Sequence, residues 1–190
     1  VTISDAPSVS ALNAIADATS GVVTATLAAG SLASFAGLTT GSADAITISV
    51  TDDNGTSLAA TDLSTLGGKT SETVTVANAV EITGTAAQVT AALVTASTLV
   101  VAGSATVTIN DLTGTSITAT TLSAIGGATS GTVTVSNAVV ITGTAAQVTA
   151  ALVTEATKVV ALNAAVTISD APSVSALNAI ADATSGVVTA

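Results

Sequence analysis

Residues Val1–Ala25 read VTISDAPSVSALNAIADATSGVVTA, and residues Val166–Ala190 repeat this stretch with identity at all 25 positions. The chain of 190 residues therefore contains one full super-repeat, 1–165, followed by the start of the next, 166–190. Self-similarity at a fixed period is typical of repeat architectures. We therefore expect the chain to be a window of a longer array.

A shorter repeat lies inside the long one. Residues 48–106 and 107–165 are equal in length and align without a gap, with 38 identities that include TVTV, NAV and ITGTAAQVTAALVT. Residues 1–47 are a shortened, diverged copy that keeps VTISD and SALNAIADATSG. Each 59-residue copy divides again into two strand–helix units, which have the dimensions of solenoid coils.

Recurrent valine and isoleucine residues mark where each coil should begin. The spacings between successive markers are 21, 26, 26, 33, 26 and 33, and the markers are Val1, Val22, Ile48, Val74, Val107, Val133 and Val166. We therefore predict six coils in each super-repeat, with the longest coils bulging outward. Six strands about 4.8 Å apart give an axial repeat of about 29 Å if the stack is straight.

Two Ala-rich segments carry the strongest helix signal. Residues 84–97 (GTAAQVTAALVTAS) and 143–156 (GTAAQVTAALVTEA) each begin with a T-x-x-Q spacing, such as Thr85 and Gln88. This spacing predicts a capping box at the start of each helix. Shorter helices of about two turns are predicted from i, i+3 apolar pairs. These pairs are Leu12/Ile15, Leu63/Leu66 before Gly67-Gly68, and Leu122/Ile125 before Gly126-Gly127.

The two Gly-Gly pairs predict left-handed helix stops. Between the helices, VTISD, ITISVTD, TVTV and VVITG are rich in β-branched residues and predict strands. Strands that alternate with short helices indicate an α/β protein, and we predict a repetitive β/α solenoid of parallel strands and short Ala-rich helices. The alternative is an all-β helix in which the Ala-rich stretches are loops or strands.

The composition excludes several classes of function. The chain has twelve acidic residues and only two basic residues, Lys69 and Lys158, which gives a formal net charge of −10. This composition leaves no basic surface for binding nucleic acid. The same acidity argues against docking on anionic lipid. Polar residues interrupt every apolar run well before the roughly 18 residues that span a bilayer, so we expect no membrane insertion.

Nothing in the sequence indicates catalysis or a cofactor. His and Cys are absent, and the many Ser and Thr residues have no adjacent base to activate them. Asp52-Asp53-Asn54-Gly55 resembles half of a calcium loop, but the bidentate Glu is missing and the twin copy reads Asp111-Leu112-Thr113-Gly114. We interpret both as turns and predict no metal site. Asp5, Asp111 and Asp170 recur as acids at strand ends, and none of them requires a cation.

Threonine pairs raise one further hypothesis. The T-x-T pairs Thr73/Thr75, Thr132/Thr134, Thr83/Thr85 and Thr142/Thr144 each place two hydroxyls on one strand face, as an ice-binding array does. Coils that carry VTISD or VVTA are expected to interrupt such an array. Asn78 and Asn137 are predicted to mark corners that need a left-handed conformation or a backbone bond.

The combination VTISD…SALNAIADATSGVV…ITGTAAQVTAALV resembles the tandem repeats of very large, low-complexity bacterial surface and secreted proteins, such as the adhesin-like giants of cyanobacteria. The resemblance covers the whole chain and implies a cell-surface, matrix or adhesive polymer. We expect the partner of the chain to be itself, either end to end along a fibre or as continuous covalent repeats, and also laterally. The calcium-binding nonapeptide of many such proteins is missing. The alternatives are a stalk or spacer of a large adhesin, or a Thr-array ice-binding protein.

Overall fold

The computed structural model describes residues 1–98, 100–157 and 159–190, so Lys158 lies outside the described residues. This described part is an α/β structure with six α-helices and three parallel sheets. In chain order its elements are α1 (Val9–Asp17), β1 (Thr24–Thr26), the 3-10 helix η1 (Leu32–Phe35), β2 (Ala45–Val50), β3 (Ser57–Ala59), α2 (Ala60–Gly67), β4 (Val74–Val76), β5 (Glu81–Gly84), α3 (Ala86–Leu93), β6 (Val100–Val101), β7 (Thr106–Ile109), β8 (Ser116–Thr118), α4 (Ala119–Gly127), β9 (Val133–Val135), β10 (Val140–Gly143), α5 (Ala145–Leu152), β11 (Val159–Val160), β12 (Ala165–Ile168), α6 (Val174–Asp182) and β13 (Val188–Thr189).

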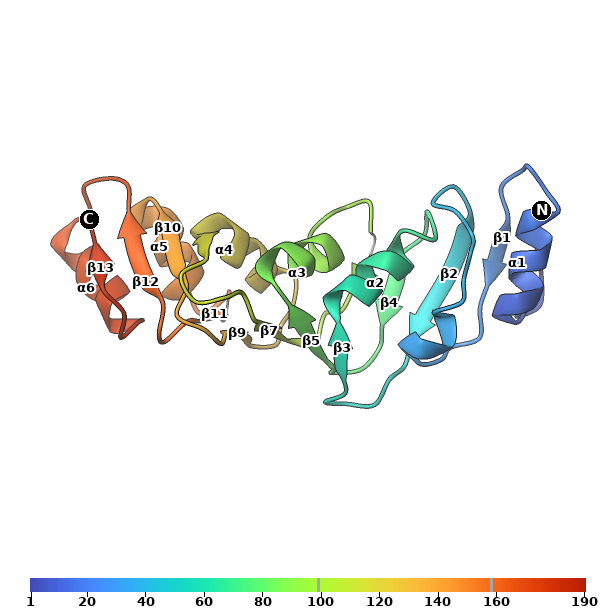
Figure 1. Cartoon of the computed structure of the whole chain (residues 1–190), viewed down its shortest axis with the longest axis horizontal. Coiled ribbons are helices and arrows are strands. Elements are labelled where there is room, and N and C mark those ends of the chain that lie inside the picture. Colours follow the sequence, from blue (N-terminus) through green and yellow to red (C-terminus); the bar gives the residue numbers. More distant parts are fainter. Residues whose placement is uncertain (99, 158) are drawn as a thin grey trace.

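Every strand pair in the described residues is parallel, and each pairs a segment with the one that follows it after a helix or loop. The three sheets have the orders β1-β2-β4-β6, β3-β5-β7-β9-β11 and β8-β10-β12-β13. The chain therefore advances by stacking one layer of strands on the previous layer (Figure 1), and its two ends lie at opposite ends of an elongated molecule.

The three sheets overlap along the molecule, so that each later sheet begins before the earlier one ends. β2 and β3 add to the first and second sheets, and so do β4 and β5 in the next layer. The following layer adds β6, β7 and β8, one strand to each sheet, and the next adds β9 and β10 to the second and third sheets. Six pairing steps lead from Thr2 to Thr167, the number expected from the sequence.

Because the sheets overlap in this way, the prediction of outward-bulging 33-residue coils is wrong. Val74 pairs with Val100 of the next layer, whereas Val107 pairs with Ile82 of the layer before it. The spacing from Val74 to Val107 therefore joins two different sheets and does not measure one coil. No coil needs to bulge, because the residues that seemed to be in excess form β5, β6, β10 and β11.

The helices follow one another along one side of the strand layers (Figure 1), and contacts join α2 to α3, α3 to α4, α4 to α5, and α5 to α6. The helix face toward the sheets carries small residues. In α5, for example, Ala145, Val148 and Ala151 are buried while Leu152 is only half-buried. Small side chains let short helices approach closely over strands that lie only about 4.8 Å apart.

The predicted capping boxes are confirmed. Thr85 accepts from the Gln88 amide at 3.3 Å while the Gln88 side chain accepts from the Thr85 amide at 2.8 Å, and Thr144 and Gln147 repeat this arrangement. The helices that follow exclude the all-β alternative. They end sooner than the Ala-rich stretches, at Leu93 and Leu152, before the sequence Val-Thr.

The predicted left-handed stops at the Gly-Gly pairs are wrong. Gly68 has a right-handed φ of −70°, and the described glycines with positive φ are Gly55 and Gly114, in the turns after β2 and β7. Gly67 and Gly126 are needed for a different reason, which is close approach. A Cβ at Gly67 would lie 1.8 Å from the Thr98 carbonyl oxygen of the next layer.

The two identical ends of the chain adopt the same local structure. α1 spans Val9–Asp17 and α6 spans Val174–Asp182, the same nine residues shifted by one period, and each helix has a Ser N-cap. Thr2 pairs with Thr24 as Thr167 pairs with Thr189.

Candidate functional site

Three aspartates at strand ends each link their own layer to the helix of the layer before it, and they occur in every second layer. Asp111 Oδ2 accepts from the Ala86 amide at 2.6 Å, and Asp170 Oδ1 accepts from the Ala145 amide at 2.7 Å. These amides belong to the first residues of α3 and α5. Asp52 caps η1 in the same way. A carboxylate at a helix N-terminus satisfies an orphan amide and interacts favourably with the helix dipole.

These bonds explain the strand-end acids that the sequence singled out. Asp111 and Asp170 each lie 25 residues after the amide that they cap, so the contact spans one layer and no local pattern reveals it. The sequence signal is the recurrence of Asp at the same place in successive copies. Asp5 occupies the equivalent place in the first layer, and its carboxylate accepts no hydrogen bond from the described residues.

The segment Asp52-Asp53-Asn54-Gly55 forms a turn that is also bound to the next layer. Asn54 Oδ1 accepts from the Ala79 amide at 3.0 Å, and the Gly55 amide donates to the Ala79 carbonyl at 2.9 Å. Gly55 has a φ of +78°, which favours glycine. Within the described residues, no three His, Cys, Asp or Glu side chains gather as a group that could hold a metal ion.

Asn78 and Asn137, which were predicted to mark corners, each donate a hydrogen bond to a backbone carbonyl. A backbone bond was one of the two roles predicted for them, the other being a left-handed conformation. Asn78 Nδ2 donates to the Asp52 carbonyl at 2.8 Å, and Asn137 Nδ2 donates to the Asp111 carbonyl at 2.7 Å. Each bond joins the end of one strand layer to the corner of the next. Because the corner of a layer exposes carbonyls that no strand covers, the amide side chain satisfies them.

Buried threonines make a second set of bonds between layers, which the sequence did not reveal. Thr70 Oγ1 donates to the Ile46 carbonyl at 2.7 Å, and Thr184 Oγ1 donates to the Ala164 carbonyl at 2.6 Å. Thr129 bonds the Ala105 carbonyl in the same way. The signal that could have found them is the recurring motif ATSG, or KTSE in one copy, just before a strand.

The outward-facing threonines form a longer row than expected. Thr118, Thr142, Thr167 and Thr189 lie on four adjacent strands of the third sheet and pair directly. The prediction that VTISD and VVTA coils interrupt the row is therefore wrong, because these segments supply its last two members. Two residues before this row, the outward-facing positions are Ser116, Val140 and Ala165, so the row has no second row of threonines on that side.

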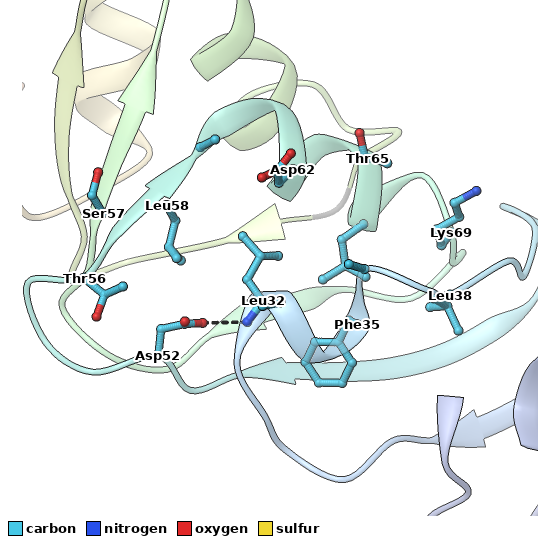
Figure 2. A pocket seen from close by; sticks show the side chains of 14 residues that line it. Leu32, Phe35, Leu38, Asp52, Thr56, Ser57, Leu58, Asp62, Thr65 and Lys69 are labelled. Carbon is cyan, nitrogen blue, oxygen red and sulfur yellow. Dashed lines mark hydrogen bonds between the residues drawn. The ribbon is translucent and has the colours of Figure 1, made fainter. Parts of the chain in front are cut away.

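A cavity of about 400 Å³ lies where η1 replaces an α-helix (Figure 2). The helical segment of the coil from Thr24 to Ala45 is only the short η1, so the row of α-helices is interrupted here. Phe35, the single aromatic residue, is buried and fills part of the gap. Asp52 Oδ2 bonds the Leu32 amide at 2.7 Å at the base of the cavity.

A related cavity of about 550 Å³ lies between α3 and the β8–α4 segment. It repeats the place of the first cavity in the next copy of the repeat, with α3 as a wall where the first cavity has η1. Its lining is mainly Ala and Thr. Thr90 is one of the lining residues, and its Oγ1 is a buried oxygen without a hydrogen-bond partner in the described residues. Both cavities thus lie where a new sheet begins, at β3 and at β8.

Comparison of the chain with protein-family models, with curated proteins and with solved structures gives no match. Among the described residues, no helix is both long and apolar enough to cross a membrane.

Proposed function

We propose that the chain is a structural segment of a β/α solenoid array, the repeat region of an extracellular fibre, filament or surface-matrix protein of a bacterium, without catalytic activity. The observation that carries the proposal is the Asp bond between layers, which recurs with the 59-residue repeat at Asp52, Asp111 and Asp170. Every second layer is thus bonded to the layer before it by the same Asp bond, which is consistent with a continuing array of two-layer repeats.

Electron microscopy of surface material from the source cells, with antibody labelling of the repeat, tests this proposal. Labelled filaments are expected, with repeats along their whole length. Discrete monodisperse particles that carry the label would contradict it.

A stalk that presents a distant adhesive domain is an alternative within the same architecture. In that case antibody against the repeat would label a stem, and a distinct non-repetitive domain would occur at one end of the parent protein. A filament labelled uniformly to both ends would argue against a stalk.

The row from Thr118 to Thr189 favours a second candidate, the ordering of water or ice at this surface. An ice-recrystallisation assay on the chain tests it, with Thr142→Val and Thr167→Val as variants. Inhibition that these variants abolish would support ice binding, and no inhibition by the parent chain would exclude it.

A further inference from the structure

Asn54 and Gly55 form the one Asn-Gly pair among the seven asparagines of the chain. In such a pair the backbone nitrogen of the second residue can attack the side-chain carbonyl carbon of the asparagine. Glycine favours this attack because no Cβ shields its nitrogen. Both residues are exposed, so water and hydroxide have access to the pair. The pair is therefore the position of the chain with the strongest chemical tendency to deamidate.

The folded structure binds both reacting groups to one residue of the next layer. The Gly55 amide donates to the Ala79 carbonyl at 2.9 Å, and Asn54 Oδ1 accepts from the Ala79 amide at 3.0 Å. The attacking nitrogen has to lose its proton, and a hydrogen-bonded backbone amide releases its proton only when that bond opens. The carbonyl group that would be attacked is held by the same residue. Ala79 thus clamps both partners of the reaction.

A second bond fastens the corner that carries Ala79. Asn78 Nδ2 donates to the Asp52 carbonyl at 2.8 Å, across the same turn. Removal of this side-chain bond would loosen the corner while leaving Asn54 and Gly55 themselves unchanged. The reactivity of the pair can therefore be separated from the clamp that covers it.

The twin turn in the next copy of the repeat has the same fastening without the reactive pair. The Gly114 amide donates to the Ala138 carbonyl at 2.8 Å, and Asn137 Nδ2 donates to the Asp111 carbonyl at 2.7 Å. Thr113 stands where the first turn has Asn54, so this turn has no side-chain amide to lose. The twin turn is therefore a built-in control.

We propose that Asn54 is a deamidation site that the layer of Ala79 keeps closed, so that it reacts only when this layer lifts from the turn. Solvent hydroxide then removes the proton of the Gly55 nitrogen, which attacks the side-chain carbonyl carbon of Asn54. A carbon–nitrogen bond forms, and the side-chain nitrogen leaves as ammonia with a proton taken from water. One water molecule opens the resulting succinimide, at one carbonyl to give aspartate and at the other to give isoaspartate.

The reaction makes a transient opening of the layer permanent. Isoaspartate carries the main chain through its side-chain carbon, which lengthens the turn, and both products place a new carboxylate next to Asp52 and Asp53. The turn therefore does not rebuild the clamp on Ala79 in its original form. A copy of the repeat that has opened is marked chemically, whereas an unopened copy keeps its asparagine. The mark depends on a single turn and forms whether or not the chain belongs to a fibre.

Peptide mapping by mass spectrometry tests the proposal on the full chain. The folded chain and the chain unfolded in urea are incubated at mildly alkaline pH, and deamidation of each asparagine is followed with time. We expect Asn54 to react slowly in the folded chain, and in urea to react faster than in the folded chain and before the other asparagines. An equal rate at Asn54 in the folded and unfolded chains would overturn the proposal.

The Asn78→Ala variant tests the clamp in the folded state. We expect Asn54 to deamidate about 2- to 10-fold faster in this variant, which is the change in an opening equilibrium that one lost hydrogen bond produces. The matched control, Asn137→Ala, loses the equivalent bond of the twin turn and should leave the rate at Asn54 unchanged. Equal rates at Asn54 in the two variants would show that the corner does not control the reaction.

Circular dichroism establishes that both variants fold. Should Asn78→Ala fail to fold, hydrogen exchange of the Gly55 amide in the unaltered chain decides the question. Exchange that is strongly slowed relative to the unfolded chain supports the clamp, and exchange as fast as in the unfolded chain contradicts it.

Discussion

Removal of the Asp111 carboxylate tests the bond between layers most sharply. The side chain is 8% exposed, and its Oδ2 accepts from the first amide of α3 at 2.6 Å. A hydrogen bond to a charged group contributes about 1.5–3 kcal/mol, and loss of a helix cap costs about 0.5–2 kcal/mol. The capping box of Thr85 remains intact in the variant. The two free-energy ranges therefore describe the loss of the same hydrogen bond, and they are not added together. We expect Asp111→Ala to lower the free energy of unfolding by about 2 kcal/mol.

Urea unfolding followed by circular dichroism measures this change, with Asp53→Ala as the matched control. Asp53 is an exposed acid in the equivalent turn, and no hydrogen bond of its carboxylate occurs in the described residues. The control should change stability by less than about 0.5 kcal/mol. Asp111→Asn, which keeps an oxygen but loses the charge, should fall between the two. Equal midpoints for Asp111→Ala and Asp53→Ala would refute the reasoning.

Other contacts in the layers lead to two further predictions. Gly126→Ala should destabilise the chain by about 1–3 kcal/mol because its Cβ would lie 2.2 Å from a backbone oxygen of the next layer. Gly127→Ala, with no atom near its Cβ, should be neutral or stabilising in the same thermal melt. Phe35→Ala should cost about 3–5 kcal/mol in urea unfolding, since the buried ring fills the gap left by the missing helix.

Local structure was largely predictable from the sequence. The T-x-x-Q spacing located α3 and α5, and β-branched runs such as TVTV located β4 and β9. These signals are local, because a cap or a strand propensity depends on residues within one turn. Helix length was less predictable, since the Val-Thr sequence after Leu93 ends the helix earlier than the Ala-rich composition indicates.

The arrangement of the sheets was not predictable in the same way. Val74 and Val107 carry the same strand signal, yet they belong to different sheets. Only the register between layers distinguishes a strand that continues one sheet from a strand that joins the next. Register depends on pairing between successive layers, such as that of Thr83 with Thr108, which no window of local sequence contains.

The contacts between layers were hidden for a related reason. The sequence singled out Asp111 as a strand-end acid but did not place it on the Ala86 amide. It also identified Gly67 and Gly126 correctly as constrained positions, but for the wrong cause. The constraint is the backbone of the next layer and not the φ angle of the glycine.

We propose that one 165-residue period adds six stacked strand layers to a continuing array. Cryo-electron microscopy of the native filaments measures this directly, together with X-ray diffraction from aligned fibres. We expect a strand spacing of about 4.8 Å along the filament axis and, for a straight stack, an axial repeat of about 29 Å. A filament built from separate globular subunits, without the strand spacing along its axis, would contradict it.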